Sequence, residues 1–270
     1  MATPVVVVTG AASGIGRACV ELFAERGFKV VAVDLAEDGL AELAAIAGVV
    51  TLTGDIAAET TNTAMVRLAA DRFGRLDVAV LNAGIGGTPP LEAAGAIERF
   101  DRILAVNVRG VALGIRAAAP ALRAAGGGAI VVTASVAGLR GEPGNWAYNA
   151  SKAAAINLVR ATAIDYATHG IRINTLAPGG TVTAMTAGAL ANPELAADVT
   201  RRIPMQRWAS PREQAEVVWF LASPAASYIT GATLPCDGGL NANTGILLPP
   251  PSPANHPDEV LHARGAVDEY

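Results

Sequence analysis

The stretch PVVVVTGAASGIG, residues 4–16, sets the first constraint on the fold. Its opening run of β-branched apolar residues is typical of a strand that is buried on both faces. A helical pattern follows three glycines spaced over residues 10–16, and a strand, a glycine-rich turn and a helix N-terminus together favour a pyrophosphate site. We expect Gly10 to make the turn, Gly14 to admit the phosphates and Gly16 to let the helix pack closely on the sheet.

The rest of the chain repeats this alternation of short apolar strands and longer helical segments. Strands are expected at residues 4–8, 29–34, 49–53, 77–82, 129–134, 171–177 and 232–236, and helices at 15–26, 37–47, 59–73, 97–124, 147–168 and 211–222. Continuously apolar strands separated by helices are typical of a parallel sheet covered on both faces. The sequence therefore predicts an α/β fold, a single doubly wound Rossmann domain of about seven strands over residues 1–240. A proline-rich extension follows over residues 241–270.

The composition excludes several classes of protein. The 270 residues are 51% hydrophobic and 16% charged, which is not the composition of a disordered chain. The net charge of −4 comes without any block of lysine or arginine, so no nucleic-acid partner is expected. Two distant cysteines and three scattered histidines indicate neither a disulfide framework nor a metal site. The N-terminus lacks a signal-peptide pattern and the uncharged run 217–236 is broken by proline and glycine, so we expect a cytoplasmic protein with no membrane partner.

The second expected strand ends at Asp34, 18 residues after Gly16. A carboxylate at this place can accept hydrogen bonds from both ribose hydroxyls of adenosine, and it repels a 2′-phosphate. Ser13 in the turn and Leu35 beside the carboxylate offer no cation that would hold such a phosphate. The sequence therefore favours NAD over NADP as the cofactor. The alternative is that Asp34 caps the helix beginning near residue 37.

A second motif, YNASK at residues 148–152, places a phenol and an ammonium four residues apart. On a helix the two side chains share one face. Hydride transfer between a nicotinamide and a carbinol carbon leaves one proton to be moved at the oxygen, so an acid/base group is needed there. We expect Lys152, together with the positive nicotinamide, to lower the pKa of Tyr148 from its usual value of about 10.

Taken in this order, the motifs resemble the classical branch of the short-chain dehydrogenase/reductase family over residues 4–239. The matching elements are the glycine turn Thr9 to Gly16, Asp55-Ile56, Leu81-Asn82-Ala83-Gly84 with leucine in place of the family's first asparagine, and Pro178-Gly179 with Thr181 and Thr183 after it. The four catalytic positions of the family are matched by Asn107, Ser135, Tyr148 and Lys152.

The resemblance implies a role for each of these residues. The implied cofactor contacts are Gly10, Ser13, Gly14, Ile15, Gly16, Asp34, Leu35, Asp55, Ile56, Asn82, Ala83, Gly84, Tyr148, Lys152, Pro178, Gly179, Thr181 and Thr183. Thr181 stands where the family commonly has an aliphatic residue, so the grip on the nicotinamide carboxamide is expected to differ locally. Ser135 would donate to the substrate oxygen, and Asn107 would hold a water that connects Lys152 to solvent. The alternative for Asn107 is an internal hydrogen-bonding bridge.

The walls of the substrate pocket are expected from residues 136–146 and from the segment after Pro178. Candidate wall residues are Val136, Glu142, Trp146, Met185 and Leu190, with residues 185–195 acting as a mobile lid, the alternative being that their apolar side chains pack on the sheet. Trp146 is equally consistent with packing under the loop, whereas Glu142 is more typical of a solvated loop charge than of a ligand. A pocket with these walls favours a secondary alcohol or ketone with a hydrophobic cyclic, aryl, terpene or steroid-like body.

The sequence thus predicts an NAD-dependent oxidoreductase that interconverts a secondary alcohol and a ketone. The proline-rich extension is expected to cross to a neighbouring subunit of a homotetramer and close its pocket, the alternative being that it lies on its own subunit. A 3-oxoacyl-[acyl-carrier-protein] reductase is disfavoured by Asp34. A non-catalytic NAD-sensing regulator would be expected to lose Tyr148 or Lys152, and both are present.

Overall fold

A parallel sheet of seven strands runs through the computed structural model, which describes residues 2–244 and 246–250. Its strands are β1 (Val5–Thr9), β2 (Lys29–Asp34), β3 (Val49–Thr53), β4 (Val78–Leu81), β5 (Gly128–Thr133), β6 (Ile171–Pro178) and β7 (Thr233–Cys236). They lie in the order β3-β2-β1-β4-β5-β6-β7, and every neighbouring pair is parallel. Strands β2 and β3 lie on one side of β1, and β4 to β7 lie on the other, so the strand order reverses between β1 and β4. Ligands bind at this point in folds of this kind. The predicted doubly wound Rossmann fold is confirmed.

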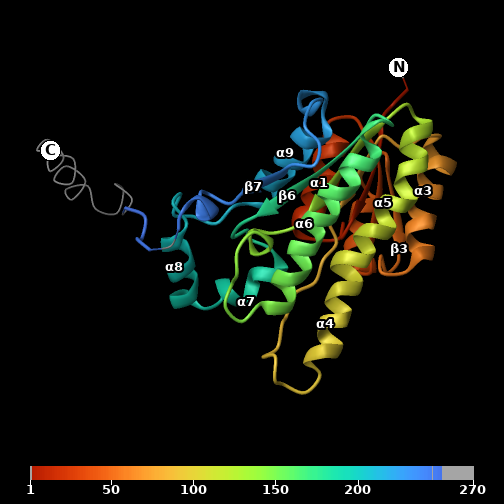
Figure 1. The fold of residues 1–270 in the computed structure, drawn as a ribbon. Coiled ribbons are helices and arrows are strands. Elements are labelled where there is room, and N and C mark those ends of the chain that lie inside the picture. Colours follow the sequence, from red (N-terminus) through yellow and green to blue (C-terminus); the bar gives the residue numbers. More distant parts are fainter. Residues whose placement is uncertain (1, 245, 251–270) are drawn as a thin grey trace, which may run out of the picture.

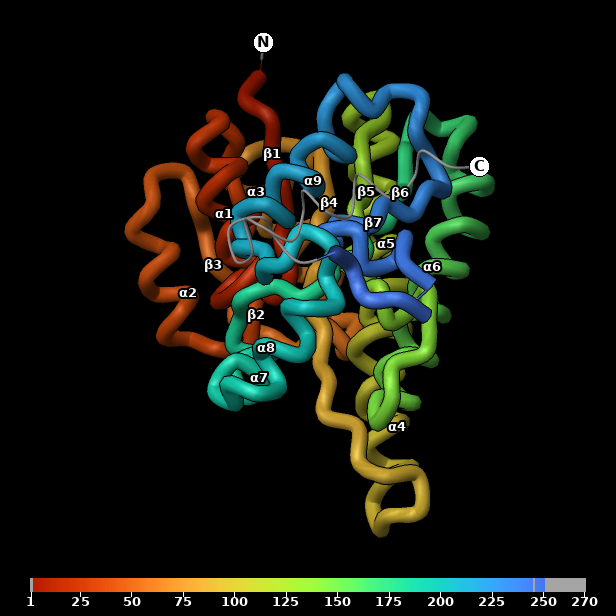
Figure 2. Tube along the Cα trace, turned by 90° about the vertical axis from the view of Figure 1, so that its left-hand side faces the viewer, coloured from red at the N-terminus to blue at the C-terminus, as the bar shows by residue number. Residues whose placement is uncertain are grey.

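Helices cover both faces of the sheet (Figures 1 and 2). One face carries α1 (Gly14–Glu25), α2 (Glu37–Ala44) and α9 (Pro211–Ala222), and the other carries α3 (Glu59–Phe73), α5 (Gly110–Ala124) and α6 (Trp146–Ala167). The two faces have separate hydrophobic cores. Along β1, Val5 and Val7 belong to the core with α3, α5 and α6, whereas Val6 and Val8 belong to the core with α1 and α9. Burial on both faces explains why the strand is apolar at every position.

The longest helix carries a local irregularity at a predicted catalytic residue. Helix α4 (Ala96–Leu104) continues through a π-helical turn, η1 (Ala105–Arg109), into α5, and Asn107 lies in that turn. Such turns are frequent at functional sites. In the described part of the chain, Ala96–Ala124 is the one helix long and apolar enough to cross a membrane. Its α5 half packs on the sheet and 56% of its apolar window is buried, so a core position accounts for this composition.

The segment expected to be loosely patterned, residues 185–195, is largely helical. It contains the end of a 3-10 turn, η3 (Ala184–Thr186), the short helix α7 (Ala187–Leu190) and the start of α8 (Pro193–Arg202). The Asn192 side chain accepts hydrogen bonds from the amides of Glu194 and Leu195 and so caps α8, while Pro193 suits the first helical turn. Neither α7 nor α8 buries a residue, so the apolar periodicity that reveals other helices is missing here. Its movement as a lid stays a prediction.

The described part of the C-terminal extension lies against its own subunit. It begins with a 3-10 turn, η5 (Leu240–Ala242), after β7. The Arg140 guanidinium donates to the carbonyls of Asn241 and Asn243, and the Gln206 amide donates to the Pro250 carbonyl at 2.7 Å. Residues 251–270 lie outside the described residues, and the crossing to a neighbouring subunit stays a prediction.

Candidate active site

The glycine turn after β1 has no room for side chains. Gly10 adopts a φ of 66°, and a Cβ placed on it would lie 2.8 Å from the Ala83 Cα. A Cβ on Gly16 would lie 2.0 Å from the carbonyl oxygen of Gly10. Gly10 thus has the backbone of the predicted turn, and Gly16 leaves room for the close packing that was predicted there. Gly14 has a φ of 54° and faces the Thr183 methyl group across the turn.

A hydrogen-bonded bracket holds this turn against the end of β4. The Thr9 hydroxyl oxygen accepts hydrogen bonds from the amides of Asn82 (3.0 Å) and Ala83 (3.1 Å). The Asn82 side chain donates in return to the carbonyls of Thr9 (3.1 Å) and Gly10 (3.3 Å). Asn82, predicted as a cofactor contact, therefore shapes the turn with its side chain. Thr9 was not among the candidate site residues, although a hydroxyl at the end of an apolar strand is a signal for it.

The N-terminus of α1 fits an anionic group. Ser13 is the N-cap residue, and within the described chain its side chain makes no capping hydrogen bond. The first-turn amides of Ile15 and Gly16 thus stay available, and they carry the positive end of the helix dipole. An open turn leading into such a helix start suits a pyrophosphate.

Asp34 bonds to the glycine turn rather than to α2. Its carboxylate accepts from the Ala12 amide at 2.9 Å, and from the amides of Leu35 (2.7 Å) and Ala36 (3.0 Å). Helix α2 begins at Glu37 without a side-chain cap, so the alternative interpretation of Asp34 as its cap is not seen. The carboxylate is held at the rim of the turn, and Leu35 beside it is 60% exposed.

Asp55 and Ile56 follow β3 and differ in their surroundings. The Asp55 carboxylate accepts from the Ala57 amide at 2.9 Å and pairs with Arg102 at 2.8 Å. The Ala57 amide, with a further contribution from Arg102, holds the pKa of Asp55 below its usual range. The Ile56 side chain is buried against Gly110 of α5. Sequence reasoning did not single out Arg102.

Lys152 is buried beneath Tyr148 at the carboxyl edge of the sheet. Its Nζ donates to the Thr133 carbonyl at 2.9 Å and lies 5.6 Å from the centroid of the Tyr148 ring. The residue is only 3% exposed, and burial lowers the pKa of its ammonium to about 8. A Cβ on Gly84 would lie 3.0 Å from this Nζ, so the glycine after β4 makes room for the lysine.

The pKa of Tyr148 is raised to about 12. Burial is the main cause, because it disfavours the phenolate; a hydrogen bond with Ser135 acts in the opposite direction, and the charge of Glu142 raises the pKa further. The prediction that this pKa falls below its usual value is wrong for the protein alone. The Lys152 cation lies over the ring and is bonded to Thr133, so it does not offset the loss of solvent around the hydroxyl.

Asn107 bridges the loop after β4 and helix α6. Its side-chain amide donates to the Ile85 carbonyl (2.9 Å) and to the Ser151 hydroxyl (3.0 Å), and its oxygen accepts from the Ile85 amide at 2.9 Å. Ser151 in turn donates to the Tyr148 carbonyl at 2.8 Å. This is the internal bridge that the sequence left open as an alternative. Its role in holding a water stays a prediction.

The comparisons with known proteins decide the family. A family model described as enoyl-(acyl carrier protein) reductase matches residues 10–241. The chain belongs to the short-chain dehydrogenase/reductase family. It is 41% identical over 246 residues to 2-(R)-hydroxypropyl-CoM dehydrogenase of Xanthobacter autotrophicus, covering 88% of this chain and 98% of that one. It is 42% identical over 243 residues to cis-4-hydroxycyclohexanecarboxylate dehydrogenase of Sinomonas cyclohexanicum, covering 88% and 96%.

Solved structures of the family superpose on this short-chain dehydrogenase/reductase. A putative NAD(P)-dependent gluconate 5-dehydrogenase from Beutenbergia cavernae, with bound NADP, matches with a TM-score of 0.83 at 39% identity over 90% of this chain and 98% of that chain. A 3-ketoacyl-(acyl-carrier-protein) reductase from Brucella melitensis, complexed with NADH, matches with a TM-score of 0.83 at 35% identity over 89% and 99%. The fold is therefore that of nicotinamide-dependent oxidoreductases. Since both cofactors occur among these structures, the preference rests on this chain's own residues.

The loop after β4 forms a wall of this short-chain dehydrogenase's site that sequence reasoning missed. The Tyr148 amide donates to the Thr88 hydroxyl at 3.3 Å, and the Trp146 indole donates to the Pro89 carbonyl at 2.9 Å. Trp146 also packs on Phe100, with ring centroids 5.3 Å apart, so it takes the packing role that the sequence left open. The glycine- and proline-rich stretch 84–90 directly after an expected strand is the signal that could have indicated this wall.

The turn after β6 directs the Thr181 hydroxyl into the protein. This hydroxyl donates to the Gly179 carbonyl at 3.0 Å and accepts from the Gln214 amide at 3.1 Å, and Thr181 is 3% exposed. The Gly179 amide donates to the Cys236 carbonyl of β7, directly after Pro178 ends β6. The polar residue at the family's aliphatic position is thus paired with Gln214, and only the backbone of Thr181 remains for a ligand.

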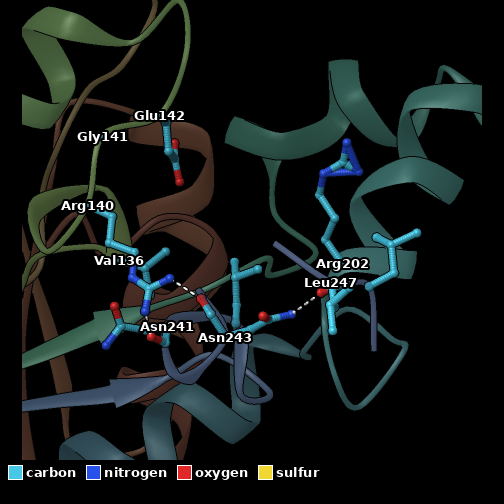
Figure 3. A pocket seen from close by; sticks show the side chains of 10 residues that line it. Val136, Arg140, Gly141, Glu142, Arg202, Asn241, Asn243 and Leu247 are labelled. Carbon is cyan, nitrogen blue, oxygen red and sulfur yellow. Dashed lines mark hydrogen bonds between the residues drawn. The ribbon is translucent and has the colours of Figure 1, made fainter. Parts of the chain in front are cut away.

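A cavity of about 260 Å³ opens beside the loop that follows Ser135 (Figure 3). It is lined by Val136, Arg140, Gly141, Glu142, Arg202, Leu240, Asn241, Asn243, Leu247 and Leu248. Two of the predicted wall residues, Val136 and Glu142, are among these. In the described chain, Trp146, Met185 and Leu190 do not line this cavity, and Met185 is 57% exposed. The contribution of the C-terminal extension to its own subunit's cavity was not expected.

Proposed function

We propose that this short-chain dehydrogenase/reductase is an NAD-dependent enzyme that interconverts secondary alcohols and ketones, with Tyr148 as the acid/base. The observation that carries the proposal is the buried ammonium of Lys152 under the Tyr148 ring, at the sheet edge where Ser135 bonds to the phenol. A buried cation beside a phenol with a perturbed pKa is typical of a catalytic site. The named relatives are dehydrogenases, which agrees with this reaction class.

Tyr148, Ser135 and Lys152 have separate roles at the substrate oxygen. The bound nicotinamide supplies or accepts the hydride. The Tyr148 hydroxyl, whose raised pKa keeps it protonated, donates its proton to a ketone oxygen and recovers one from an alcohol in the reverse direction. Ser135 lies two residues past β5 and donates to the same oxygen. Lys152 supplies a fixed positive potential next to the phenol, which stabilises the phenolate while it exists.

The preference for NAD rests on Asp34. Its carboxylate is fixed by the Ala12 amide at the rim of the glycine turn, where it would accept from ribose hydroxyls and repel a 2′-phosphate. Arg17 lies in the first part of α1, and its guanidinium is paired with Glu21 at 3.0 Å and with Glu42 at 2.5 Å. A cation neutralised by two carboxylates is a poor partner for a phosphate. A cytoplasmic homotetramer is the expected form of the enzyme.

The reaction is tested with a panel of secondary alcohols and either NAD or NADP, following the absorbance of the reduced cofactor. We expect turnover with NAD and a loss of kcat of about 100-fold or more in Tyr148→Phe, since the acid/base group is removed. Tyr228→Phe is the matched control, because Tyr228 is fully exposed. Full activity of Tyr148→Phe contradicts the mechanism, and a preference for NADP contradicts the role of Asp34.

A 3-oxoacyl thioester reductase is the second candidate. It is favoured by the likeness to the 3-ketoacyl-(acyl-carrier-protein) reductase of Brucella melitensis. Asp34 argues against it if the reductase depends on NADP. Turnover of a 3-oxoacyl-CoA that exceeds that of every alcohol and simple ketone in the panel would establish this alternative.

A further inference from the structure

The C-terminal extension forms a strap along the cavity, which we define as residues 240–244 and 246–250. Figure 3 shows Asn241, Asn243 and Leu247 lying between the loop with Arg140 and Glu142 on one side and Arg202 on the other. Asp237 holds the start of the strap, because its carboxylate accepts from the amides of Gly239 (2.9 Å) and Asn241 (2.7 Å). It therefore spans the two predicted walls of the substrate pocket.

Side chains from both walls hold the strap in place. From the first wall, the Arg140 guanidinium donates to the carbonyls of Asn241 and Asn243. From the second, Gln206 donates to the Pro250 carbonyl at 2.7 Å, and within the strap Asn243 donates to the Leu247 carbonyl at 3.1 Å. Two bonds from one planar guanidinium fix orientation as well as distance, which a lysine cannot reproduce.

The second anchor lies on an unusual backbone. Gln206 has a φ of 50°, and it is the one residue other than glycine with a positive φ in the described part of the chain. Residues with side chains rarely adopt this region, and such conformations gather where a function requires them. Here the conformation occurs at the residue that bonds to the far end of the strap.

The strap presents unburied apolar side chains to a cavity whose opposite wall begins at the residue after Ser135. Leu247 and Leu248 line the cavity and yet are 77% and 48% exposed. Val136, on the opposite wall, follows Ser135 directly, and the charge of Glu142 acts on the Tyr148 phenol. Exposed apolar side chains around a cavity beside a reactive group are typical of a surface that a ligand covers.

We propose that the strap is the specificity wall of the alcohol site, that Leu247 and Leu248 contact the substrate body, and that Arg140 is the positioning residue that holds them there. The cavity of about 260 Å³ lies below the roughly 300–1,000 Å³ of pockets for drug-sized ligands. The substrate is therefore a compact secondary alcohol of about one ring, rather than a steroid. This rests on the proposed function, because Tyr148 marks where the carbinol lies.

The test compares three alcohols of increasing size, propan-2-ol, cyclohexanol and a steroid 3-alcohol, with saturating NAD. The wild type should give its highest kcat/KM with cyclohexanol. In Arg140→Ala and Leu248→Ala, the KM for cyclohexanol should rise about tenfold with little change in kcat, since contacts with the substrate body are lost and the reacting groups are untouched. Propan-2-ol has only two methyl groups beyond its carbinol and so offers the strap the smallest body, and its KM should stay within about twofold.

Two further variants complete the design. Arg140→Lys should give an intermediate KM, because one ammonium replaces a two-pronged donor. Arg67→Ala is the matched control: Arg67 forms an exposed ion pair with Asp71 on α3 and should behave as the wild type. Hydrogen exchange of residues 240–244 and 246–248 gives a readout without turnover, and it should quicken in Arg140→Ala and not in Arg67→Ala.

The outcomes separate this proposal from the reaction itself. Equal rises in KM for propan-2-ol and cyclohexanol, or unchanged exchange in Arg140→Ala, overturn the positioning role of Arg140. A wild-type preference for the steroid alcohol overturns the size inference. The proposed function is contradicted instead if no alcohol is turned over while hydrogen exchange of the strap still quickens in Arg140→Ala.

Discussion

Replacing Gly84 by alanine tests whether the space around the Lys152 ammonium is needed. The added methyl group would lie 3.0 Å from Lys152 Nζ, 3.2 Å from Asn107 Oδ1 and 3.8 Å from Lys152 Cε. Ordinary contacts between carbon and a neighbouring heavy atom are about 3.5–4.0 Å. The ammonium must therefore move by several tenths of an ångström, and it is held in place by its 2.9 Å bond to the Thr133 carbonyl.

The magnitude follows from this geometry. Lys152 is 3% exposed, so its head group cannot escape to solvent. Overpacking of a filled site costs about 1–3 kcal/mol, which corresponds to a fall in Tm of about 2–12 °C for a chain of this size. A displaced ammonium no longer supports the phenol in its working position, and misplacements on the scale of an ångström cost about 100-fold in rate. We expect kcat to fall about 10- to 100-fold.

The assay pairs thermal unfolding with steady-state kinetics on the best alcohol of the panel. Gly188→Ala is the matched control for stability, since a Cβ on Gly188 meets no atom within 4 Å and its backbone is not in the left-handed region. That variant should keep the wild-type Tm. If Gly84→Ala keeps the Tm of Gly188→Ala and the kcat of the wild type, the reasoning about the lysine's confined position is refuted.

Two further predictions concern buried polar groups. Burial lowers the pKa of Lys152 from 10.5 to about 8. Between these two pH values the unfolded chain holds a proton on Lys152 that the folded chain lacks, so the free energy of unfolding should rise with pH there. Lys152→Met should abolish this rise, which is measured as Tm against pH, and should abolish activity. It should also raise the free energy of unfolding at pH 7 by up to about 3 kcal/mol. A Tm that depends on pH as in the wild type contradicts this prediction. Thr9→Val should lower stability by about 1–3 kcal/mol because the amides of Asn82 and Ala83 lose their acceptor, and denaturant unfolding measures it. An unchanged unfolding midpoint counts against this bracket.

Much of the fold could be predicted because each strand carries its own signal. The run Val5–Thr9 is apolar at every position since both faces of the sheet are covered, and the same pattern marks the other central strands. The helix α8 was missed for the converse reason. It buries no residue, so no apolar period marks it, and only the cap at Asn192-Pro193 indicates where it begins.

The site was predictable where a residue type is required by local chemistry. Glycines at positions 10 and 16 are needed because a Cβ would collide with backbone atoms there. In the protein without its cofactor, the pKa of Tyr148 lies above its usual value and not below it, because the sequence shows the lysine and not the burial of the hydroxyl. Burial depends on the loops that surround the phenol, such as the one held by Trp146 through Pro89.

The sequence by itself determined the doubly wound sheet, the glycine turn and the helical spacing of Tyr148 and Lys152, because each depends on residues close together in the chain. Only the tertiary structure decided what surrounds them. The bracket between Thr9 and Asn82 spans 73 residues, and the bonds from Arg140 to the strap span 101 and 103. Contacts of this range depend on how the packed sheet and its loops bring distant segments together, so no local pattern in the sequence predicts that the chain's end forms a wall of its own cavity.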